Sequence, residues 1–379
     1  MLLDTAPAAP RHWEIFCNVV DHFGDIGVSW RLARQLAAEH GLQIRLWVDD
    51  LATFHQLWPQ VDPAQRRQWV EGVDIRHWTP EADASDIGDV VVEAFGSRLS
   101  DGWLEAMAAR TPRPVWINLE YLSAEEWVPE FHGRVSPHPR LPLTKYFFFP
   151  GVTAGTGGVL RERALDVERN AFLHDQEPRA GYVTTVSLFG YGGPSVRSLL
   201  DAWSGGPDTM LALVPESRLL PDVARFFGQP RIQAGDRFER GNLSLLVLPF
   251  QRQDLYDRLL WRCDCNFVRG EDSFVRAQWA ERPLVWNIYP QDNGAHWGKL
   301  HAFSQRYSED LDDAVAASIR EFWRLWNRGE TSATILGTAW QRLWIHRDTL
   351  QSQARRWAGR LREIGDLASN LVDFTRSRL

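Results

Sequence analysis

Two carboxylates lie close together near the start of the chain, Asp21 and Asp25, within the segment Asn18–Gly27. The segment lies where a dinucleotide-binding loop would, at the end of an apolar run, but it lacks the glycine pattern of such a loop. Carboxylates would also repel a pyrophosphate. One interpretation is structural: Asp25 caps the next helix and Asp21 stabilises a turn. The other is chemical: the pair holds a cation or removes a proton.

A second polar segment follows the apolar run Cys265–Val268 and consists of Arg269, Gly270, Glu271, Asp272 and Ser273. A helix is predicted to begin there, and its first backbone N–H groups suit a diphosphate. Arg269 adds a planar, forked positive charge. Ser273 could cap the helix, donate to a phosphate, or do both. This order of strand, glycine, acidic residue and helix resembles the donor site of GT-B glycosyltransferases.

Aromatic residues follow two further predicted strands. Phe189 and Tyr191 come after Leu188, and Phe250 comes after Leu248, with Gln253 three residues later. An aromatic ring just past a strand can stack on a nucleotide base. Taken one at a time, Phe189 and Phe250 could equally be core residues.

The sequence predicts no metal site. Asp310-Leu311-Asp312 matches a D-x-D pattern, but it precedes a helical run and is interpreted as a solvated helix start. Cys263 and Cys265 lack further cysteines or suitably spaced histidines to complete a zinc site. His296 either borders a sugar or is structural.

The candidate residues can come together only if the strands before them end at the same edge of a sheet. The sequence predicts two sets of strands that could do so. Apolar runs and helical patterns alternate in both halves, which predicts parallel sheets with right-handed crossovers. The first set of predicted strands is Trp13–Val20, Ile44–Val48, Val90–Ala94 and Val115–Leu119, with a helix at Val28–His40. The second set is Tyr182–Leu188, Met210–Val214, Leu243–Leu248, Cys265–Val268 and Leu284–Ile288.

The predicted fold class is therefore α/β, of the GT-B type, with two Rossmann-like domains facing a central cleft. The N-terminal domain covers residues 1–175, and a C-terminal helix at about 350–379 crosses back to pack on it. The C-terminal domain covers residues 176–349. A chain of 379 residues is long enough for two such domains.

Composition excludes several classes of protein. The net charge is −7, and arginines are interleaved with acidic residues, which argues against nucleic acid as a partner. No apolar run approaches the roughly 20 residues of a membrane span, and the first residues do not resemble a signal peptide. Three cysteines give no disulfide framework. We therefore expect a cytoplasmic protein without a membrane partner. The 19 tryptophans mostly follow helical spacing and are predicted to be core residues.

Across nearly its whole length the chain resembles the elongation factor P arginine rhamnosyltransferases. The resemblance is carried by five motifs: Asn18–Gly27, Asn118–Glu125, Phe148–Gly151 with Thr156-Gly157-Gly158, the Phe189/Tyr191 loop, and Arg269–Phe274.

This resemblance implies a GT-B fold whose C-terminal domain binds dTDP-β-L-rhamnose without a metal cofactor. It implies transfer with inversion to an arginine of elongation factor P, a modification that helps ribosomes through polyproline stretches. Asp21 and Asp25 then match acceptor-side aspartates, and Glu271 matches a catalytic carboxylate of the donor domain. The implied nucleotide-sugar positions are Phe189, Tyr191, Phe250, Gln253, Arg269, Gly270, Asp272 and Ser273.

Three alternatives stay open at this point. The chain could be a GT-B transferase with a lipid or small-molecule acceptor, or a nucleotide-sugar epimerase of the same architecture. It could also be a binding protein that recognises elongation factor P without modifying it. Carboxylates such as Asp21 and Glu271 argue against the last alternative, because a binder has no need of them beside a sugar diphosphate.

Overall fold

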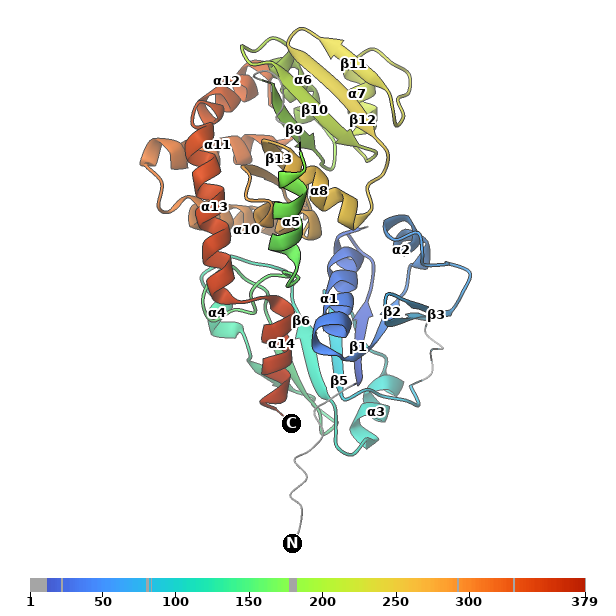
Figure 1. The fold of residues 1–379 in the computed structure, drawn as a ribbon. Coiled ribbons are helices and arrows are strands. Elements are labelled where there is room, and N and C mark those ends of the chain that lie inside the picture. The colour runs from blue at the N-terminus through green and yellow to red at the C-terminus, as the bar shows by residue number, and fades with distance from the viewer. Residues whose placement is uncertain are drawn as a thin grey trace. The chain divides into compact units, whose positions relative to one another are not determined.

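The computed structural model describes residues 12–21, 23–79, 82, 84–176, 183–291, 293–329 and 331–378. The chain forms two compact units. Unit 1 comprises the chain up to Arg163 together with the segment from Leu361 onward, and unit 2 comprises Ala164–Arg360. Figure 1 shows a sheet flanked by helices in each unit. The sequence prediction placed the first boundary near residue 175, whereas helix α5 (Leu165–His174), which precedes that position, belongs to unit 2.

The described part of unit 1 forms an eight-stranded sheet in the order β3-β4-β2-β1-β5-β6-β8-β7. The pairs β3/β4 and β7/β8 are antiparallel, and the other pairs are parallel. The strands β2 to β4 lie on one side of β1, and β5 to β8 lie on the other. The topological switch point, at which the strand order reverses direction, therefore lies between β1 and β5. The strands are β1 (His12–Cys17), β2 (Gln43–Val48), β3 (Arg67–Val70), β4 (Val73–His77), β5 (Val90–Ala94), β6 (Val115–Leu119), β7 (Val135–Pro137) and β8 (Thr144–Phe148).

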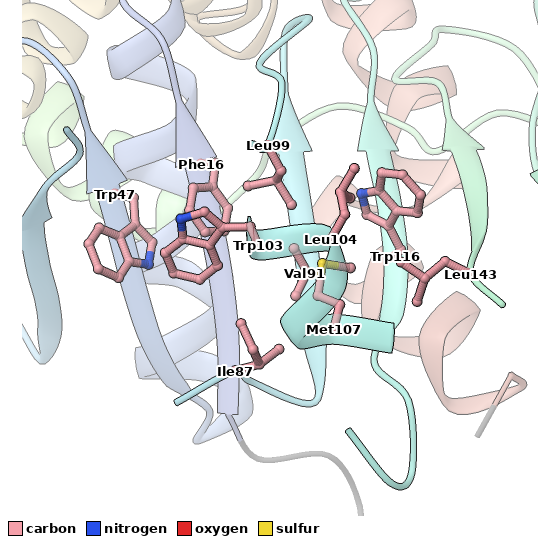
Figure 2. Packing of buried hydrophobic residues seen from close by; sticks show 10 residues of the cluster. All are labelled: Phe16, Trp47, Ile87, Val91, Leu99, Trp103, Leu104, Met107, Trp116 and Leu143. Carbon is pink, nitrogen blue, oxygen red and sulfur yellow. The ribbon is translucent and has the colours of Figure 1, made fainter. Parts of the chain in front are cut away.

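Helix α3 (Asp101–Ala109) covers one face of this sheet and completes its core. Figure 2 shows Trp103, Leu104 and Met107 of this helix packed toward the strands. The Trp103 ring lies 4.9 Å from the Phe16 ring and 5.2 Å from the Trp47 ring, both edge-on, a geometry that aromatic pairs favour. The remaining helices of the N-terminal segment are α1 (Gly24–His40), α2 (Leu51–Leu57) and α4 (Val128–Phe131).

The C-terminal helix α14 (Leu367–Arg376) packs on α1 within unit 1. Gln35 of α1 donates to a carboxylate oxygen of Asp366 at 3.0 Å, and the same oxygen caps α14 by accepting from the Ser369 N–H at 3.1 Å. Helix α13 (Arg347–Ile364) precedes this segment, and it belongs to unit 2 as far as Arg360.

The described residues of unit 2 form a six-stranded sheet in the order β11-β12-β10-β9-β13-β14, and among these strands only β11 is antiparallel to its neighbour. Its switch point lies between β9 and β13. The strands are β9 (Thr184–Leu188), β10 (Met210–Pro215), β11 (Arg237–Arg240), β12 (Leu243–Leu248), β13 (Cys265–Arg269) and β14 (Leu284–Asn287). Tyr182, the predicted start of the first of these strands, lies outside the described residues.

The helices of unit 2 bury most of its tryptophans, as their spacing predicted. Trp323 and Trp326 of α11, and Trp340 and Trp344 of α12, are each at most 4% exposed. Besides α5 and α13, the helices are α6 (Pro194–Ser204), α7 (Leu220–Phe226), α8 (Gln253–Arg262), α9 (Asp272–Trp279), α10 (Ala295–Ser308), α11 (Asp313–Arg328) and α12 (Ala333–Trp344).

Candidate functional site

Asp25 lies within the first turn of α1, because this helix begins at Gly24 rather than at the predicted Val28. Its side chain is buried, and one carboxylate oxygen accepts from the backbone N–H groups of Val20 and Asp21 at 2.9 and 2.8 Å. Burial raises the pKa of Asp25, and these two backbone bonds oppose that shift. The carboxylate therefore binds backbone N–H groups of this loop that could otherwise bind an anion.

Asp21 differs from Asp25 in being partly exposed. Its carbonyl oxygen accepts from the Gly24 N–H at 2.7 Å, which closes a tight turn. A Cβ atom at Gly24 would lie 2.7 Å from a carboxylate oxygen of Asp21, so glycine leaves room for this side chain beside the helix start. Of the two predicted carboxylates, Asp21 is therefore the one that solvent reaches. His22, the next residue, lies outside the described residues.

Side chains from the two neighbouring strands hold the start of this loop. After β2, Asp49 accepts from the Val19 N–H and from the Asn18 side-chain amide, both at 2.9 Å. After β5, the hydroxyl of Ser97 accepts from the Asn18 N–H at 3.0 Å. The predicted strand Trp13–Val20 consequently ends at Cys17, because the backbone beyond it bonds to side chains instead of to a neighbouring strand.

Phe95, at the end of β5, has a backbone conformation that is unusual for a residue other than glycine. Its φ angle is +55°, in the left-handed region, and its ring is buried. The Tyr121 ring stacks on it at 5.0 Å, and the Tyr121 hydroxyl donates to the Phe95 carbonyl at 3.4 Å. Such backbone strain costs about 1 to 3 kcal/mol and is concentrated at functional sites. The strained residue lies at the switch point of unit 1.

In unit 2 the loops after β9 and β13 meet through an arginine between aromatic rings. The guanidinium carbon of Arg269 lies 4.8 Å from the centre of the Phe189 ring and 4.7 Å from that of Tyr191. Arg269 is buried, and both aromatic rings are partly exposed. Tyr256 of α8 packs on Phe189 at 5.5 Å. The structure thus brings three predicted nucleotide-sugar residues together at the switch point of this sheet.

The glycine-rich loop after Phe189 is held by Asn287, the last residue of β14. The Tyr191 N–H donates to the Asn287 side-chain oxygen at 2.9 Å, and a Cβ atom at Gly190 would lie 2.9 Å from that oxygen. Gly193 has a φ of +113° and donates its N–H to Asp222 at 2.7 Å. The glycines therefore serve a tight turn beneath Tyr191 and the start of α6.

The segment after β13 forms the turn into α9. Ser273 is buried, and its hydroxyl accepts from the Arg269 N–H at 3.0 Å and donates to the Arg269 carbonyl. The two roles considered for Ser273 were a helix cap and a phosphate donor. In this structure its hydroxyl instead bonds to the backbone of Arg269, at the end of β13. Gly270 has a φ of +59°, and its carbonyl accepts from the Trp286 indole N–H at 2.8 Å. Glu271 is partly exposed at the N-cap position of α9.

Gln253 and Asp272 connect the first turns of α8 and α9. The Gln253 amide donates to the Asp272 carboxylate at 3.1 Å, and Gln253 is buried. Deeper in the same helix pair, Arg276 and Asp257 form a buried two-pronged ion pair at 3.0 and 2.7 Å. This pair fixes the spacing of the two helices, and with it the positions of Gln253 and Asp272.

Phe250 lies on a third loop, after β12, and is partly exposed. Its N–H donates at 3.3 Å to Glu216, which follows β10 and also accepts from the Ala234 N–H at 3.4 Å. The strands β12, β10, β9 and β13 are all parallel, so Phe250 and Arg269 lie at the same edge of the sheet, although two strands separate β12 from β13.

The other sequence candidates contribute no cluster of ligands. Among the described residues, no group of three or more histidine, cysteine, aspartate or glutamate side chains could hold a metal ion. Asp312 is the N-cap of α11, as predicted for a helix start. His296 accepts from the Gln291 N–H at 3.0 Å within its own loop, and Cys263 and Cys265 are buried free thiols.

Four residues of these two sites were missed from the sequence: Asp49, Ser97, Glu216 and Asn287. Each lies at or just past the end of a strand on the same edge as the predicted residues. The available signal was a polar residue at the carboxyl end of a strand that neighbours a candidate loop. The strand order is needed to tell which strands neighbour a candidate loop, and the sequence pattern does not contain it.

The fold matches known glycosyltransferases at low sequence identity. MurG of Acinetobacter baumannii covers 97% of this chain and 100% of its own, with a TM-score of 0.52 and 12% identity. The glycosyltransferase VinC, solved in complex with dTDP, covers 97% of this chain and 100% of its own, with a TM-score of 0.51 and 9% identity. With two Rossmann-like units, the chain has the GT-B fold of these glycosyltransferases.

Closer relatives define the family. The family model for elongation factor P (EF-P) rhamnosyltransferase EarP matches residues 13–376. A protein-arginine rhamnosyltransferase of Pseudomonas putida is 46% identical, covering 97% of this chain and 99% of the relative, and one of Neisseria meningitidis is 35% identical over 91% of each. The chain therefore belongs to the EarP family of elongation factor P rhamnosyltransferases.

A solved structure from this family agrees with both the fold and the family assignment. It is described as the structural basis for EarP-mediated arginine glycosylation of translation elongation factor EF-P. It is 34% identical, covers 97% of this chain and 99% of its own, and has a TM-score of 0.67. Among the described residues, no helix has the length and apolar character needed to cross a membrane.

Proposed function

We propose that this protein transfers L-rhamnose from dTDP-β-L-rhamnose to an arginine of elongation factor P, with inversion at the anomeric carbon. Membership of the family supports this activity. The observation that carries the proposal is the different chemistry of the two switch points. In unit 1 a buried carboxylate, Asp25, binds the backbone of the loop and a second carboxylate, Asp21, is partly exposed, whereas in unit 2 an arginine lies against two aromatic rings.

The donor belongs to unit 2 in this proposal. Arg269 and the first N–H groups of α9 neutralise the diphosphate, since both supply positive potential at a strand end. The aromatic side chains Phe189, Tyr191 and Phe250 surround the thymine base and the deoxyribose. Because Arg269 packs on two of these rings, diphosphate binding and ring position are coupled. VinC, which shares this fold, is known in complex with dTDP.

Three polar residues complete the donor side. Gln253 and Asp272, already bonded to each other, line the helix starts that face the nucleotide sugar. Glu271 is the candidate catalytic carboxylate of this unit, because it is partly exposed at the N-cap of α9. Gly270 lets the chain turn from β13 into that helix, and Ser273 fixes the turn.

The acceptor belongs to unit 1, with Asp21 as the general base. A guanidinium nitrogen attacks the anomeric carbon on the face opposite to the diphosphate, so that a C–N bond forms as the C–O bond to dTDP breaks. Asp21 takes the proton that the nitrogen loses, and dTDP leaves with the bonding electron pair. Asp25, which is buried, holds the backbone of this loop, so we assign it a positioning role beside the base.

The proposed reaction uses no metal cofactor. Its leaving group is a nucleoside diphosphate, whose charge Arg269 and the N-terminus of α9 can stabilise in place of a divalent ion. Elongation factor P works on the ribosome, so we place the reaction in the cytoplasm, where the modification supports translation of polyproline stretches.

Intact-mass measurement of elongation factor P after incubation with the protein and dTDP-rhamnose tests this proposal. The expected product is heavier by one deoxyhexose, and reactions without the protein or without the donor are the controls. An unchanged mass, with dTDP-rhamnose bound to the protein, would contradict the proposal and favour a different acceptor or a binding function.

A further inference from the structure

We propose that Asp49 is a positioning residue that fixes the loop carrying Asp21, with Ser97 as a second anchor. This inference rests on the proposed role of Asp21 as the base in arginine rhamnosyl transfer. Neither residue belongs to the carboxylate pair of the loop or to the nucleotide-sugar positions. Both act through the backbone between the end of β1 and Asp21.

The strand order places these anchors on both sides of the loop. In the sheet, β1 lies between β2 and β5. Asp49 follows the end of β2, and Ser97 follows the end of β5. A loop leaving β1 is therefore flanked by one side chain from each neighbouring strand, and both reach its first residues.

Asp49 binds the main chain and a side chain at once. One carboxylate oxygen accepts from the Val19 N–H at 2.9 Å, and the other accepts from the side-chain amide of Asn18 at 2.9 Å. Hydrogen bonds to a carboxylate are shorter and roughly twice as strong as neutral ones. The pair of bonds sets both the position and the direction of the chain two residues before Asp21.

Ser97 holds the same loop from the opposite side. Its hydroxyl accepts from the Asn18 N–H at 3.0 Å and donates to the Ala94 carbonyl at 2.7 Å, and the side chain is buried. The Asn18 N–H is therefore held by an oxygen that is itself fixed to the end of β5. Together with Asp25, these residues provide side-chain acceptors for four consecutive backbone N–H groups, from Asn18 to Asp21.

Helix capping does not account for Asp49. Helix α2 is capped by the next residue, Asp50, whose carboxylate accepts from the Thr53 N–H at 2.9 Å. The Asp49 carboxylate is instead directed at the neighbouring loop. General-base catalysis needs the base within hydrogen-bond distance of the proton, and a displacement of about 1 Å can reduce the rate about a hundredfold. We therefore expect loss of these bonds to lower kcat rather than donor affinity.

Asp49 could act through its hydrogen bonds or through its negative charge alone. Exchanging the side chains of Asn18 and Asp49 separates these two explanations. The single variant Asn18→Asp places two carboxylates opposite each other, and Asp49→Ala removes both acceptors of the loop. The double variant Asn18→Asp with Asp49→Asn restores a complementary pair, with donor and acceptor reversed, and the introduced amide oxygen can still accept from the Val19 N–H.

We expect each single variant to lower kcat at least tenfold, with the KM for elongation factor P and the affinity for dTDP changed less than threefold. The double variant should recover kcat to within about threefold of the wild type. Asp50→Asn, a matched change at the neighbouring helix cap, should leave kcat unchanged. Unaltered kcat in Asp49→Ala, or a double variant no better than Asn18→Asp alone, would overturn the inference.

Ser97→Ala provides an independent arm if the Asp49 variants fail to fold, which loss of dTDP binding together with kcat would reveal. It should lower kcat with dTDP affinity retained, and an unaffected kcat would overturn the inference. Failure of the proposed function is distinguishable from both outcomes, because the wild-type protein would then add no rhamnose to elongation factor P.

Discussion

Guanidinium, the acceptor group of the proposed reaction, is a poor nucleophile. It stays protonated in water, with a pKa above about 12, and its lone pairs are delocalised. A partly exposed carboxylate on a fixed loop addresses both difficulties, because it orients one nitrogen by hydrogen bonding and accepts the proton as the new bond forms. Asp21 has that exposure, whereas the carboxylate of Asp25 is turned to the backbone of its own loop.

The first prediction concerns Asp21→Asn. The amide keeps the size of the side chain but cannot accept the proton, so turnover should fall at least a hundredfold while affinity for dTDP changes less than twofold. Steady-state kinetics with elongation factor P and calorimetry with dTDP measure the two quantities. Asp62→Asn, on the surface of the same unit, is the matched control. An Asp21→Asn enzyme that keeps a tenth of wild-type turnover would exclude the base role.

The second prediction concerns Arg269→Ala. A charge-assisted contact to a diphosphate is worth about 1.5 to 3 kcal/mol, which corresponds to roughly a tenfold to hundredfold weaker dTDP binding. The substitution also removes the cation between Phe189 and Tyr191, so the loss should extend to the nucleotide as a whole. Calorimetry against Arg262→Ala, an exposed arginine of α8, provides the comparison, and equal affinities would remove Arg269 from the site.

At the scale of elements, strand order decides which side chains meet. The alternation of strands and helices was predictable from apolar periodicity, as were the loops after β1, β9, β12 and β13, because ligands bind beyond the carboxyl ends of parallel strands. The partners Asp49 and Asn287 were not predictable, because each lies far along the chain from the loop it holds. Only the order of strands, which periodicity does not contain, makes them neighbours.

Helix starts show the same limit. The apolar pattern predicted that α1 begins at Val28, but the helix begins at Gly24. The prediction began too late because Gly24, Asp25 and Gly27 do not contribute to an apolar pattern. That difference moved Asp25 from a free loop into a helical turn. Asp25, which the sequence paired with Asp21 as a candidate for holding a cation, is instead buried and accepts hydrogen bonds from the backbone of the loop.

The third prediction follows from the loop after β9. Asn287→Ala removes the acceptor of the Tyr191 N–H, so the ring of Tyr191 should lose its fixed place beside Arg269. We expect dTDP affinity to fall about fivefold to twentyfold, since a buried donor left unsatisfied costs about 1 to 3 kcal/mol and part of the loop can relax. Calorimetry measures this change.

Asn293→Ala, on the surface loop after β14, is the matched control for this variant. Its side chain accepts only from the Ala295 N–H of its own turn among the described hydrogen bonds. If Asn287→Ala bound dTDP as tightly as the control, Tyr191 would not depend on this anchor.

At the scale of the whole molecule, the proposed function gives different roles to two similar units. Both are doubly wound sheets with a switch point beside their first strand. In unit 1 the carboxylate of Asp25 binds the backbone N–H groups of Val20 and Asp21, whereas unit 2 has Arg269 at the end of β13, just before the start of α9. Composition and length indicated two domains, but the division of chemistry between them depends on single side chains at equivalent places in the two sheets.

The fourth prediction is that turnover survives removal of divalent metals. Arg269 and the N-terminus of α9 supply the positive potential that a metal ion supplies in other transferases. Treatment with EDTA should leave the rate within twofold of the untreated enzyme. A rate that collapses and returns on addition of magnesium would show that a metal carries the leaving diphosphate.

The most direct test of the account is to locate the transferred sugar on elongation factor P by fragmentation mass spectrometry, after reaction with dTDP-rhamnose. We expect one deoxyhexose on an arginine side chain with the wild-type enzyme and almost none with Asp21→Asn. None is expected when that arginine is replaced by lysine, which cannot form the same forked hydrogen bonds. A deoxyhexose on another residue type, efficient transfer to the lysine, or equal modification by Asp21→Asn would contradict these expectations.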